Sequence, residues 1–238
     1  MKTTAVVLAG GSGKRMNADR PKQYLELCGH PLLYYSLRAF EDSFIDEIVL
    51  VTAAGEEEYC RTQIVETYGF QKVRQIVPGG KERYHSVMCG IKAVSEDADY
   101  IFIHDGARPF ITEEILARVY SDVQEKKACV VGMPVKDTIK IAGERGVVKD
   151  TPKRALVWQV QTPQVFDAGL IRRAYGRLEK EEAELLARGV EITDDAMIVE
   201  LLSGHEVYLV EGSYENIKVT TPDDLEYAGW LFAKKLEK

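Results

Sequence analysis

The chain has few of the residues from which disulfide frameworks and zinc sites are built. Its 238 residues include four cysteines, Cys28, Cys60, Cys89 and Cys129, which are widely spaced and form no C-x-x-C pair. Its four histidines form no H-E-x-x-H spacing. Neither a disulfide framework nor a structural zinc site is therefore expected.

Long hydrophobic runs are also missing. The N-terminal apolar run, residues 5–9, ends at a pair of glycines and is shorter than a signal-peptide core or a membrane-spanning helix requires. We therefore expect a cytoplasmic protein with no membrane partner.

Positive charge is in deficit, because the formal net charge is -7. Non-specific binding to nucleic acid depends on a broad basic surface that displaces counterions, so no nucleic-acid partner is expected. Any anion-binding site must be local, and the positions of individual lysines and arginines become the informative signal.

The patterns that are present predict an α/β protein with one domain, residues 1–238. Short β-branched apolar runs have the character of strands at 4–9, 48–53, 73–77, 100–104 and 128–134. Helical periodicity occupies 31–41, 56–68, 84–94 and 112–125. This alternation is typical of a mainly parallel sheet covered by helices.

The alternation lapses after Pro134. In residues 135–159, two strand-like pieces flank a turn signal at 142–146, which predicts a projecting β-arm at about 136–157. Helices are expected again at 168–187 and 194–202, followed by a strand at 207–210. A last helix should begin with Thr221 as its N-cap and Pro222 at its first position.

A glycine-rich segment, LAGGSGKRM at 8–16, follows the first predicted strand directly. It lacks the G-x-G-x-x-G spacing, and Arg15 stands where a P-loop needs Ser or Thr. An ordinary tight turn is one interpretation. The cations of Lys14, Arg15 and Lys22 beside the glycines favour another, a binding site for a polyphosphate.

These motifs carry a resemblance to a known family. Residues 8–16 followed by PKQY at 21–24 look like the signature of nucleotidyltransferases that act on sugar and polyol phosphates. The segments 79–87, 104–110, 134–138, 161–164, 193–195 and 211–220 resemble, in order, the 2-C-methyl-D-erythritol 4-phosphate cytidylyltransferase family.

The resemblance implies a fold, a reaction and partners. The fold is a three-layer αβα arrangement around a mainly parallel, Rossmann-like sheet of the nucleotide-diphospho-sugar transferase type. The reaction transfers CMP from CTP to 2-C-methyl-D-erythritol 4-phosphate with Mg²⁺ and releases pyrophosphate, a step of isoprenoid biosynthesis by the methylerythritol phosphate pathway. The β-arm implies a homodimer, in which it embraces a second subunit.

The resemblance also implies roles for individual residues. Catalysis falls to Arg15, Lys22 and Lys218 around the CTP phosphates and to Arg154, which holds the polyol phosphate in the neighbouring subunit's site. The nucleotide is bound by Ala9, Gly10, Gly11, Gly13, Gly80, Lys81, Ser86, Asp105 and Ala107. The polyol phosphate is bound by Asp105, Arg108, Thr138, Arg154, Thr162, Thr193, Asp194 and Lys218. Asp105 also lies near the magnesium ion.

Ordinary alternatives exist for these residues. The cations are otherwise solvated surface side chains, and the lone Thr and Asp residues are otherwise turn and cap formers. Lys81 departs from the family pattern, because many relatives carry an acidic residue there.

Three other functions are compatible with parts of the sequence. A ribitol 5-phosphate cytidylyltransferase shares the glycine loop and the PKQ signature, although Gly106 and the run 193–195 favour the methylerythritol substrate by resemblance. A metal-dependent sugar transferase would use Asp97 and Asp99 as a D-x-D site. A nucleotide-binding module would bind CTP without turnover.

Overall fold

The computed structural model describes residues 1–11 and 21–236 of the chain. A seven-stranded sheet forms its middle layer, in the order β11-β7-β10-β6-β1-β4-β5. The strands are β1 (Thr3–Ala9), β4 (Glu47–Thr52), β5 (Val73–Pro78), β6 (Tyr100–Asp105), β7 (Ala128–Pro134), β10 (Trp158–Asp167) and β11 (Tyr208–Glu211). Only β10 runs antiparallel to its neighbours in this sheet. The predicted mainly parallel sheet is confirmed.

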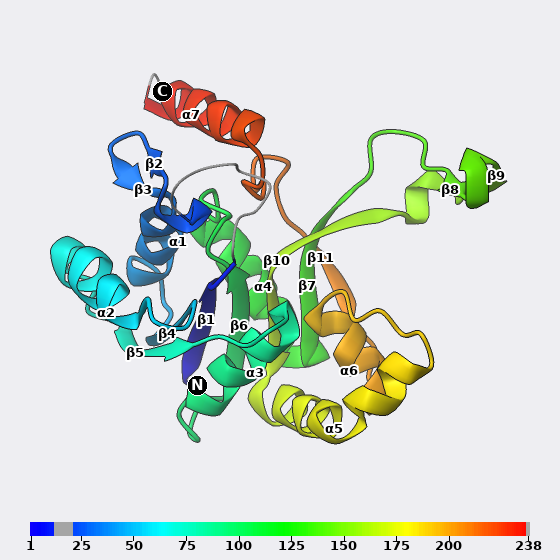
Figure 1. Cartoon of the computed structure of the whole chain (residues 1–238), viewed down its shortest axis with the longest axis horizontal. Coiled ribbons are helices and arrows are strands. Elements are labelled where there is room, and N and C mark those ends of the chain that lie inside the picture. Colours follow the sequence, from blue (N-terminus) through cyan, green and yellow to red (C-terminus); the bar gives the residue numbers. More distant parts are fainter. Residues whose placement is uncertain (12–20, 237–238) are drawn as a thin grey trace.

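Helices cover both faces of the sheet because its strands point side chains alternately to either side (Figure 1). One face packs against α1 (Leu32–Glu41), α4 (Glu113–Lys126) and the helical segment formed by α2 (Glu57–Tyr59) and the π-helix η3 (Cys60–Glu66). The other face packs against α3 (Arg83–Ala93), α5 (Ala168–Ala187) and α6 (Asp195–Ser203).

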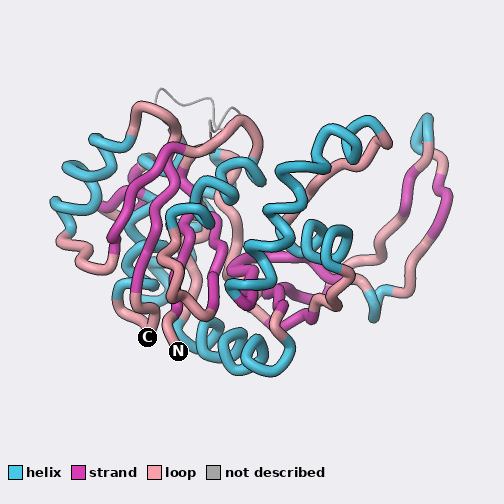
Figure 2. The backbone as a smooth tube through the Cα atoms, turned by 90° about the horizontal axis from the view of Figure 1, so that it is seen from below, coloured by secondary structure: helices cyan, strands magenta, loops and turns pink. Residues whose placement is uncertain are grey.

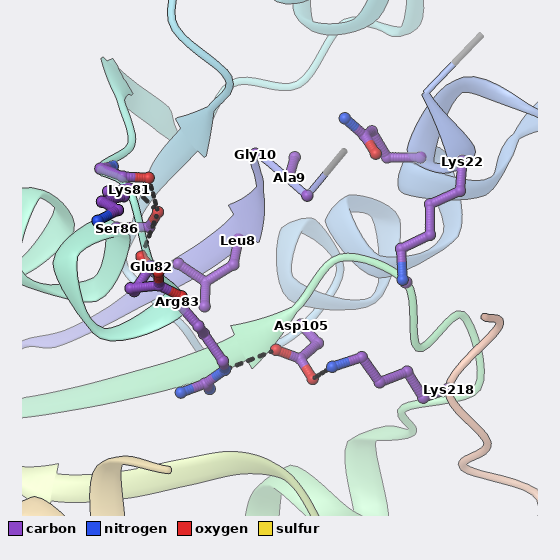
Figure 3. Close-up of a pocket in the computed structure, with 14 residues that line it drawn as sticks. Leu8, Ala9, Gly10, Lys22, Lys81, Glu82, Arg83, Ser86, Asp105 and Lys218 are labelled. Atoms are coloured by element: carbon purple, nitrogen blue, oxygen red, sulfur yellow. Dashed lines mark hydrogen bonds and ion pairs between the residues drawn. The ribbon is translucent and has the colours of Figure 1, made fainter. Parts of the chain in front are cut away.

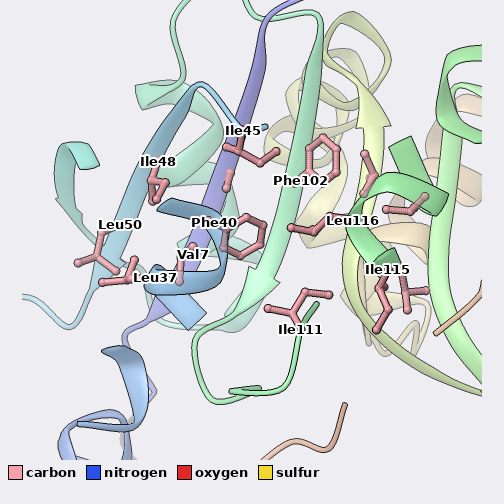
Figure 4. Close-up of a cluster of buried hydrophobic side chains, with 14 of the residues drawn as sticks. Val7, Leu37, Phe40, Ile45, Ile48, Leu50, Phe102, Ile111, Ile115 and Leu116 are labelled. Atoms are coloured by element: carbon pink, nitrogen blue, oxygen red, sulfur yellow. The ribbon is translucent and has the colours of Figure 1, made fainter. Parts of the chain in front are cut away.

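The hydrophobic core follows from this alternation. On β1, Val7 joins the cluster under α1 and α4, whereas Val6 joins the cluster under α3 and α5. Figure 4 shows the first cluster, in which Phe40 of α1 and Phe102 of β6 are both fully buried. Burial of such large apolar side chains is the dominant stabilising term for the three-layer body.

The predicted β-arm is present and stands away from the body in both Figure 1 and Figure 2. Its tip is a two-stranded ladder of β8 (Ile141–Ala142) and β9 (Val148–Asp150), joined through the short helix η4 (Glu144–Gly146). Gly146 has a φ of +74° at this turn, a conformation that glycine adopts without strain. The short helix η5 (Arg154–Leu156) then leads back into β10.

Strand β10 was not predicted. Pro163 lies in its middle, and proline in a sequence argues against a central strand because it cannot donate a ladder hydrogen bond. The structure accommodates Pro163 at an irregularity, since the pairing of β10 with β7 shifts register between Val160 and Gln164.

The C-terminal helix α7 (Pro222–Leu236) begins where the sequence predicts. The backbone N–H of Asp224 donates to Thr221 Oγ1, and the Asp224 carboxylate accepts from the backbone N–H groups of Thr220 and Thr221. The helix packs near the small ladder of β2 (Glu26–Leu27) and β3 (His30–Pro31), which follows the short helix η2 (Lys22–Tyr24). None of the described helices is both long enough and apolar enough to cross a membrane.

Candidate active site

A cavity of about 350 Å³ opens where β1 and β6 end and α3 begins (Figure 3). This is the carboxyl edge of the parallel strands, where ligand sites of open α/β sheets gather. Ten predicted site residues line it: Ala9, Gly10, Gly11, Lys22, Gly80, Lys81, Ser86, Asp105, Ala107 and Lys218. Residues from five separate stretches of sequence therefore meet at one edge of the sheet.

Two glycines allow the strand ends to approach each other. A Cβ on Gly10 would lie 3.0 Å from the carbonyl oxygen of Thr52 on β4, and one on Gly106 would lie 2.9 Å from the carbonyl oxygen of Leu8. The backbone N–H of Gly106 donates to that Leu8 oxygen at 2.9 Å. The end of β6, with Asp105, is thus fixed against the end of β1.

Asp105 is the electrostatic centre of the cavity. The residue is 7% exposed, with Lys218 Nζ 2.8 Å from Oδ2, Arg83 Nε 3.3 Å from Oδ1 and Arg108 Nε 3.8 Å from Oδ2. Burial alone would raise the pKa of Asp105, but these three cations hold that pKa well below its ordinary value. Asp105 is therefore ionised at every physiological pH.

Arg83, the first residue of α3, joins Asp105 to a second buried carboxylate. Its Nη2 lies 2.9 Å from Oδ2 of Asp195, a fully buried residue at the start of α6. The Tyr175 hydroxyl donates to the other oxygen of Asp195 at 2.6 Å. Burial would lower the pKa of Arg83, but the two carboxylates raise it above its usual value, so Arg83 stays charged.

A layer of hydrogen bonds beneath the cavity holds the end of β6. The backbone N–H of Asp105 donates to Thr162 Oγ1 at 3.1 Å, and that hydroxyl lies 3.0 Å from His104 Nδ1. Burial lowers the pKa of His104 to about 4, so this imidazole is neutral near pH 7. The Arg108 guanidinium donates to the Asn216 carbonyl oxygen, which ties the segment before Lys218 to β6.

The loop before α3 is held in a fixed shape by its own polar groups. The backbone N–H of Gly80 donates to Ser86 Oγ at 3.1 Å. Tyr84 and His85 both contact the Glu182 carboxylate of α5, and the hydrogen bond from Tyr84 is the main reason why the pKa of Glu182 lies below its ordinary value. Residues 80–86 thus form a rigid wall of the cavity.

Six predicted residues do not line this cavity. Arg108 forms an ion pair with Asp105, and Thr162 Oγ1 accepts a hydrogen bond from the backbone N–H of Asp105. Thr138 and Arg154 are exposed on the arm, where Arg154 Nη1 donates to the Lys136 carbonyl oxygen. Thr193 and Asp194 precede α6, and the Asp194 carboxylate accepts from the backbone N–H of Met197 as its N-cap. Gly13 and Arg15 lie outside the described residues.

Four lining residues had no predicted role: Leu8, Gln23, Glu82 and Arg83. Gln23 and Arg83 lie within the motif segments 21–24 and 79–87, so the sequence located them. Their burial and partners were not visible there, because Arg83 meets Asp195 only in the folded chain.

The alternative D-x-D site is contradicted. Asp97 forms an ion pair with Lys2 Nζ at 2.9 Å, and the Asp99 carboxylate accepts a hydrogen bond from the backbone N–H of Lys2 at 2.7 Å. Both carboxylates tie the N-terminus to the start of β6 and do not line the cavity.

Asp105 suits a magnesium ion that binds together with phosphates. Mg²⁺ is commonly held by one or two carboxylates plus substrate phosphate oxygens, and Asp105 presents an ionised carboxylate to the cavity. Within residues 1–11 and 21–236, no group of three or more His, Cys, Asp or Glu side chains gathers as a metal site. A magnesium ion beside Asp105 would therefore need further oxygen ligands from a bound substrate.

Comparison with known proteins identifies the family. The family model for IspD, 2-C-methyl-D-erythritol 4-phosphate cytidylyltransferase, matches residues 3–234. The chain belongs to this family. It is 48% identical to the 2-C-methyl-D-erythritol 4-phosphate cytidylyltransferase of Lachnoclostridium phytofermentans over 95% of this chain and 94% of that protein. It is 49% identical to the Lachnospira eligens protein of the same name over 97% and 99%.

Solved structures agree with this assignment. The 4-diphosphocytidyl-2C-methyl-D-erythritol synthase of Anaerococcus prevotii matches with a TM-score of 0.81 and 31% identity, covering 98% of both chains. The Francisella tularensis 2-C-methyl-D-erythritol 4-phosphate cytidylyltransferase matches with a TM-score of 0.78 and 28% identity, covering 97% of this chain and 99% of that one. The predicted family, fold class and cytidylyltransferase activity are confirmed. This activity converts CTP and 2-C-methyl-D-erythritol 4-phosphate to 4-diphosphocytidyl-2-C-methyl-D-erythritol and pyrophosphate.

Proposed function

We propose that the cavity beside Asp105 is where the CTP phosphates bind and where the phosphate of 2-C-methyl-D-erythritol 4-phosphate attacks. The main support is an observation on the described residues: among them, the cavity is lined by four basic side chains, Lys22, Lys81, Arg83 and Lys218, and by two acidic ones, Glu82 and Asp105. This local excess of cations lies in a chain with a net charge of -7. A triphosphate is a ligand with the matching charge.

The chemistry requires little acid–base help from the protein. A phosphate monoester has a second pKa of about 6, so the attacking phosphate is mostly dianionic at neutral pH. The difficulty is charge repulsion during in-line attack on the α-phosphate, together with the negative charge that moves onto the departing pyrophosphate. We assign Lys22 and Lys218, which line the cavity, and Arg15 to the stabilisation of this charge.

The rest of the cavity has distinct roles. We assign the backbone at Ala9, Gly10 and Gly11 to the nucleotide, which Ala107 borders, and Gly80, Lys81 and Ser86 to its cytosine end. Gly13, which lies outside the described residues, is assigned to the nucleotide from the motif alone. Asp105 would hold magnesium with the triphosphate oxygens, and the bound ion would neutralise phosphate charge. Asp105 also fixes the Lys218 ammonium at 2.8 Å, so this lysine is positioned before substrate arrives.

The polyol phosphate is assigned to a site shared between two copies of the chain. We assign its binding to six residues: Arg154, Thr138, Thr162, Thr193, Asp194 and Arg108. Arg154 would come from the arm of a neighbouring subunit. Support comes from the apolar side chains that the arm exposes: Leu156 is 77% exposed, Val147 60% and Val148 53%. Exposed apolar surface on a projecting hairpin is typical of an interface.

A cytoplasmic location completes the proposal. The four cysteines are free, including Cys60 and Cys129, which are buried. Free thiols are typical of proteins in reducing compartments.

The test is pyrophosphate release with CTP and magnesium, in parallel with 2-C-methyl-D-erythritol 4-phosphate, ribitol 5-phosphate or no acceptor. We expect turnover only with the methylerythritol phosphate. Turnover with ribitol phosphate alone would contradict the acceptor assignment, and CTP binding without turnover would indicate a nucleotide-binding module.

A further inference from the structure

The side chain of Gln23 has an unusual environment. This residue is 2% exposed and lines the cavity. Neither its Nε2 nor its Oε1 has a hydrogen-bond partner among the residues that the structure describes. A buried amide without partners costs free energy, because its hydrogen bonds to water are lost on folding and not replaced.

The other two buried glutamines in the described ranges provide an internal comparison. Gln161 donates to the Ser213 carbonyl oxygen at 2.7 Å and accepts from Asn216 Nδ2 at 3.2 Å. Gln164 accepts from the backbone N–H groups of Asp195 and Ala196 and donates to Asp194. These two buried glutamines therefore have hydrogen-bond partners for both amide groups, whereas Gln23 has none among the described residues.

Gln23 is also held in place before any ligand arrives. It is the middle residue of η2, between Lys22 and Tyr24. The Tyr24 hydroxyl lies 2.7 Å from the Glu56 carboxylate and 3.1 Å from Cys60 Sγ, and Lys22 Nζ donates to the Val219 carbonyl oxygen. These contacts fix η2 against two other parts of the chain, so Gln23 is held in position beside the cavity before a ligand binds.

The position of Gln23 favours the phosphate end of the nucleotide. Its neighbour Lys22 lies across the cavity from Ser86, which belongs to the wall assigned to cytosine, and Lys22 and Lys218 lie together on the other side (Figure 3). The Gly80 and Ser86 groups of the cytosine wall already hydrogen-bond to each other. Gln23 follows Lys22 directly in η2, and an amide at this position would add a neutral N–H donor for phosphate oxygen without adding charge.

We propose that Gln23 Nε2 donates a hydrogen bond to a non-bridging oxygen of the β- or γ-phosphate of CTP, the part that leaves as pyrophosphate. The proposal rests on the assignment of this cavity to CTP. When the bond between the α-phosphorus and its bridging oxygen breaks, that electron pair goes to pyrophosphate, and the Gln23 contact strengthens as the charge arrives. Gln23 is then a substrate-contacting residue that acts on both affinity and rate.

The test uses Gln23→Met, which keeps the side-chain length but removes both amide groups. Calorimetric titration of the full-length protein with CTP, CMP and inorganic pyrophosphate, each with magnesium, measures binding. We expect the Kd for CTP and pyrophosphate to rise about tenfold, the value for losing one hydrogen bond to a charged group, while the Kd for CMP stays unchanged. The Tm of the ligand-free variant should be unchanged or higher, because a buried amide without partners has been removed.

Three further variants make the test more specific. Gln23→Glu places a carboxylate against phosphate, so it should weaken pyrophosphate binding more than Gln23→Met does. Gln164→Met is the stability control: its amide is fully partnered, so this change should lower the Tm. Gln124→Met, at an exposed position of α4, should alter neither binding nor Tm.

A lower Tm for Gln23→Met with an unchanged Kd for pyrophosphate would overturn the inference and make Gln23 a structural residue. An equal loss of CMP and CTP affinity would overturn it as well, since the contact would then be to the nucleoside end. Failure of the proposed function looks different: the wild-type protein would release no pyrophosphate from CTP with 2-C-methyl-D-erythritol 4-phosphate.

Discussion

Asp105 shows how one residue can organise a site whose other members are cations. Lys218, Arg83 and Arg108 come from three separate segments and would repel one another without the carboxylate between them. Removing one partner of a buried ionic group leaves the others uncompensated, which is a strongly destabilising change. Asp105 therefore stabilises the arrangement of the three cations around the cavity.

Asp105→Asn should lower the Tm by an amount that depends on pH. The pKa of this carboxyl is depressed in the folded state, so its ionised form stabilises the fold above the unfolded pKa of about 3.9, and this stabilisation is lost as the pH falls towards the folded pKa. Thermal unfolding at pH 7 and at pH 3 should show a large difference from wild type at pH 7 and a smaller one at pH 3. Asp42→Asn, which alters only an exposed pair with Arg38, is the control. A Tm difference independent of pH would contradict this assignment.

Lys22→Ala should lower kcat for pyrophosphate release by about two orders of magnitude, by analogy with losing one preorganised oxyanion contact, and the same is expected of Arg15→Ala. Lys126→Ala is a matched control, because Lys126 ends α4 just before β7 begins, at the opposite edge of the sheet. Steady-state kinetics at saturating CTP and polyol phosphate measures both. A kcat within twofold of wild type for Lys22→Ala would remove Lys22 from the catalytic set.

The positions of side chains were predictable where a motif marks them and unpredictable where burial decides them. Lys22, Asp105 and Lys218 each lie in one of the motif segments, and all three line the cavity. The Arg83–Asp195 ion pair joins residues more than a hundred positions apart, and the missing partners of Gln23 are a property of the folded interior. No local signal in the sequence reports either one.

At the scale of elements, the predicted helices and strands follow hydrophobic periodicity, and their observed bounds differ from the expected ones by a few residues. The short ladder of β2 and β3 was not predicted, and neither was strand β10. This strand lies between β6 and β7 in the sheet, but its sequence lacks a strand pattern because it contains the polar residues Gln159, Gln161 and Gln164 and the central Pro163. Tertiary packing overrides weak local preference there.

The arm is the element that we assign to contacts with a second copy of the chain. Arg154→Ala should raise KM for the polyol phosphate while leaving CTP affinity intact, because this guanidinium is assigned to the incoming phosphate. Arg145→Ala, at the tip of the same arm, is the matched control and should change neither. Initial rates at varied polyol phosphate, together with CTP titration, separate the two effects. An unchanged KM for Arg154→Ala would count against the assignment.

At the scale of the whole molecule, the cavity and the arm are separate parts of one chain. The cavity lies at the edge of the sheet, whereas the arm stands away from the body (Figure 1). In the proposed function, each complete site combines the cavity of one subunit with the arm of its partner in a symmetric homodimer.

Subunit complementation tests this claim most directly. Lys22→Ala and Arg154→Ala chains, each inactive or impaired alone, are co-expressed with different tags, and the mixed dimer is purified through both tags. The assay uses the polyol phosphate at or below its wild-type KM, where the raised KM of Arg154→Ala lowers the rate. Pyrophosphate release by the mixed dimer should then reach about half the wild-type rate, because it holds one intact cavity facing one intact Arg154. Activity no higher than that of the two separate variants, in a preparation shown by native mass spectrometry to be mixed dimer, would contradict the claim that each site is shared between two subunits.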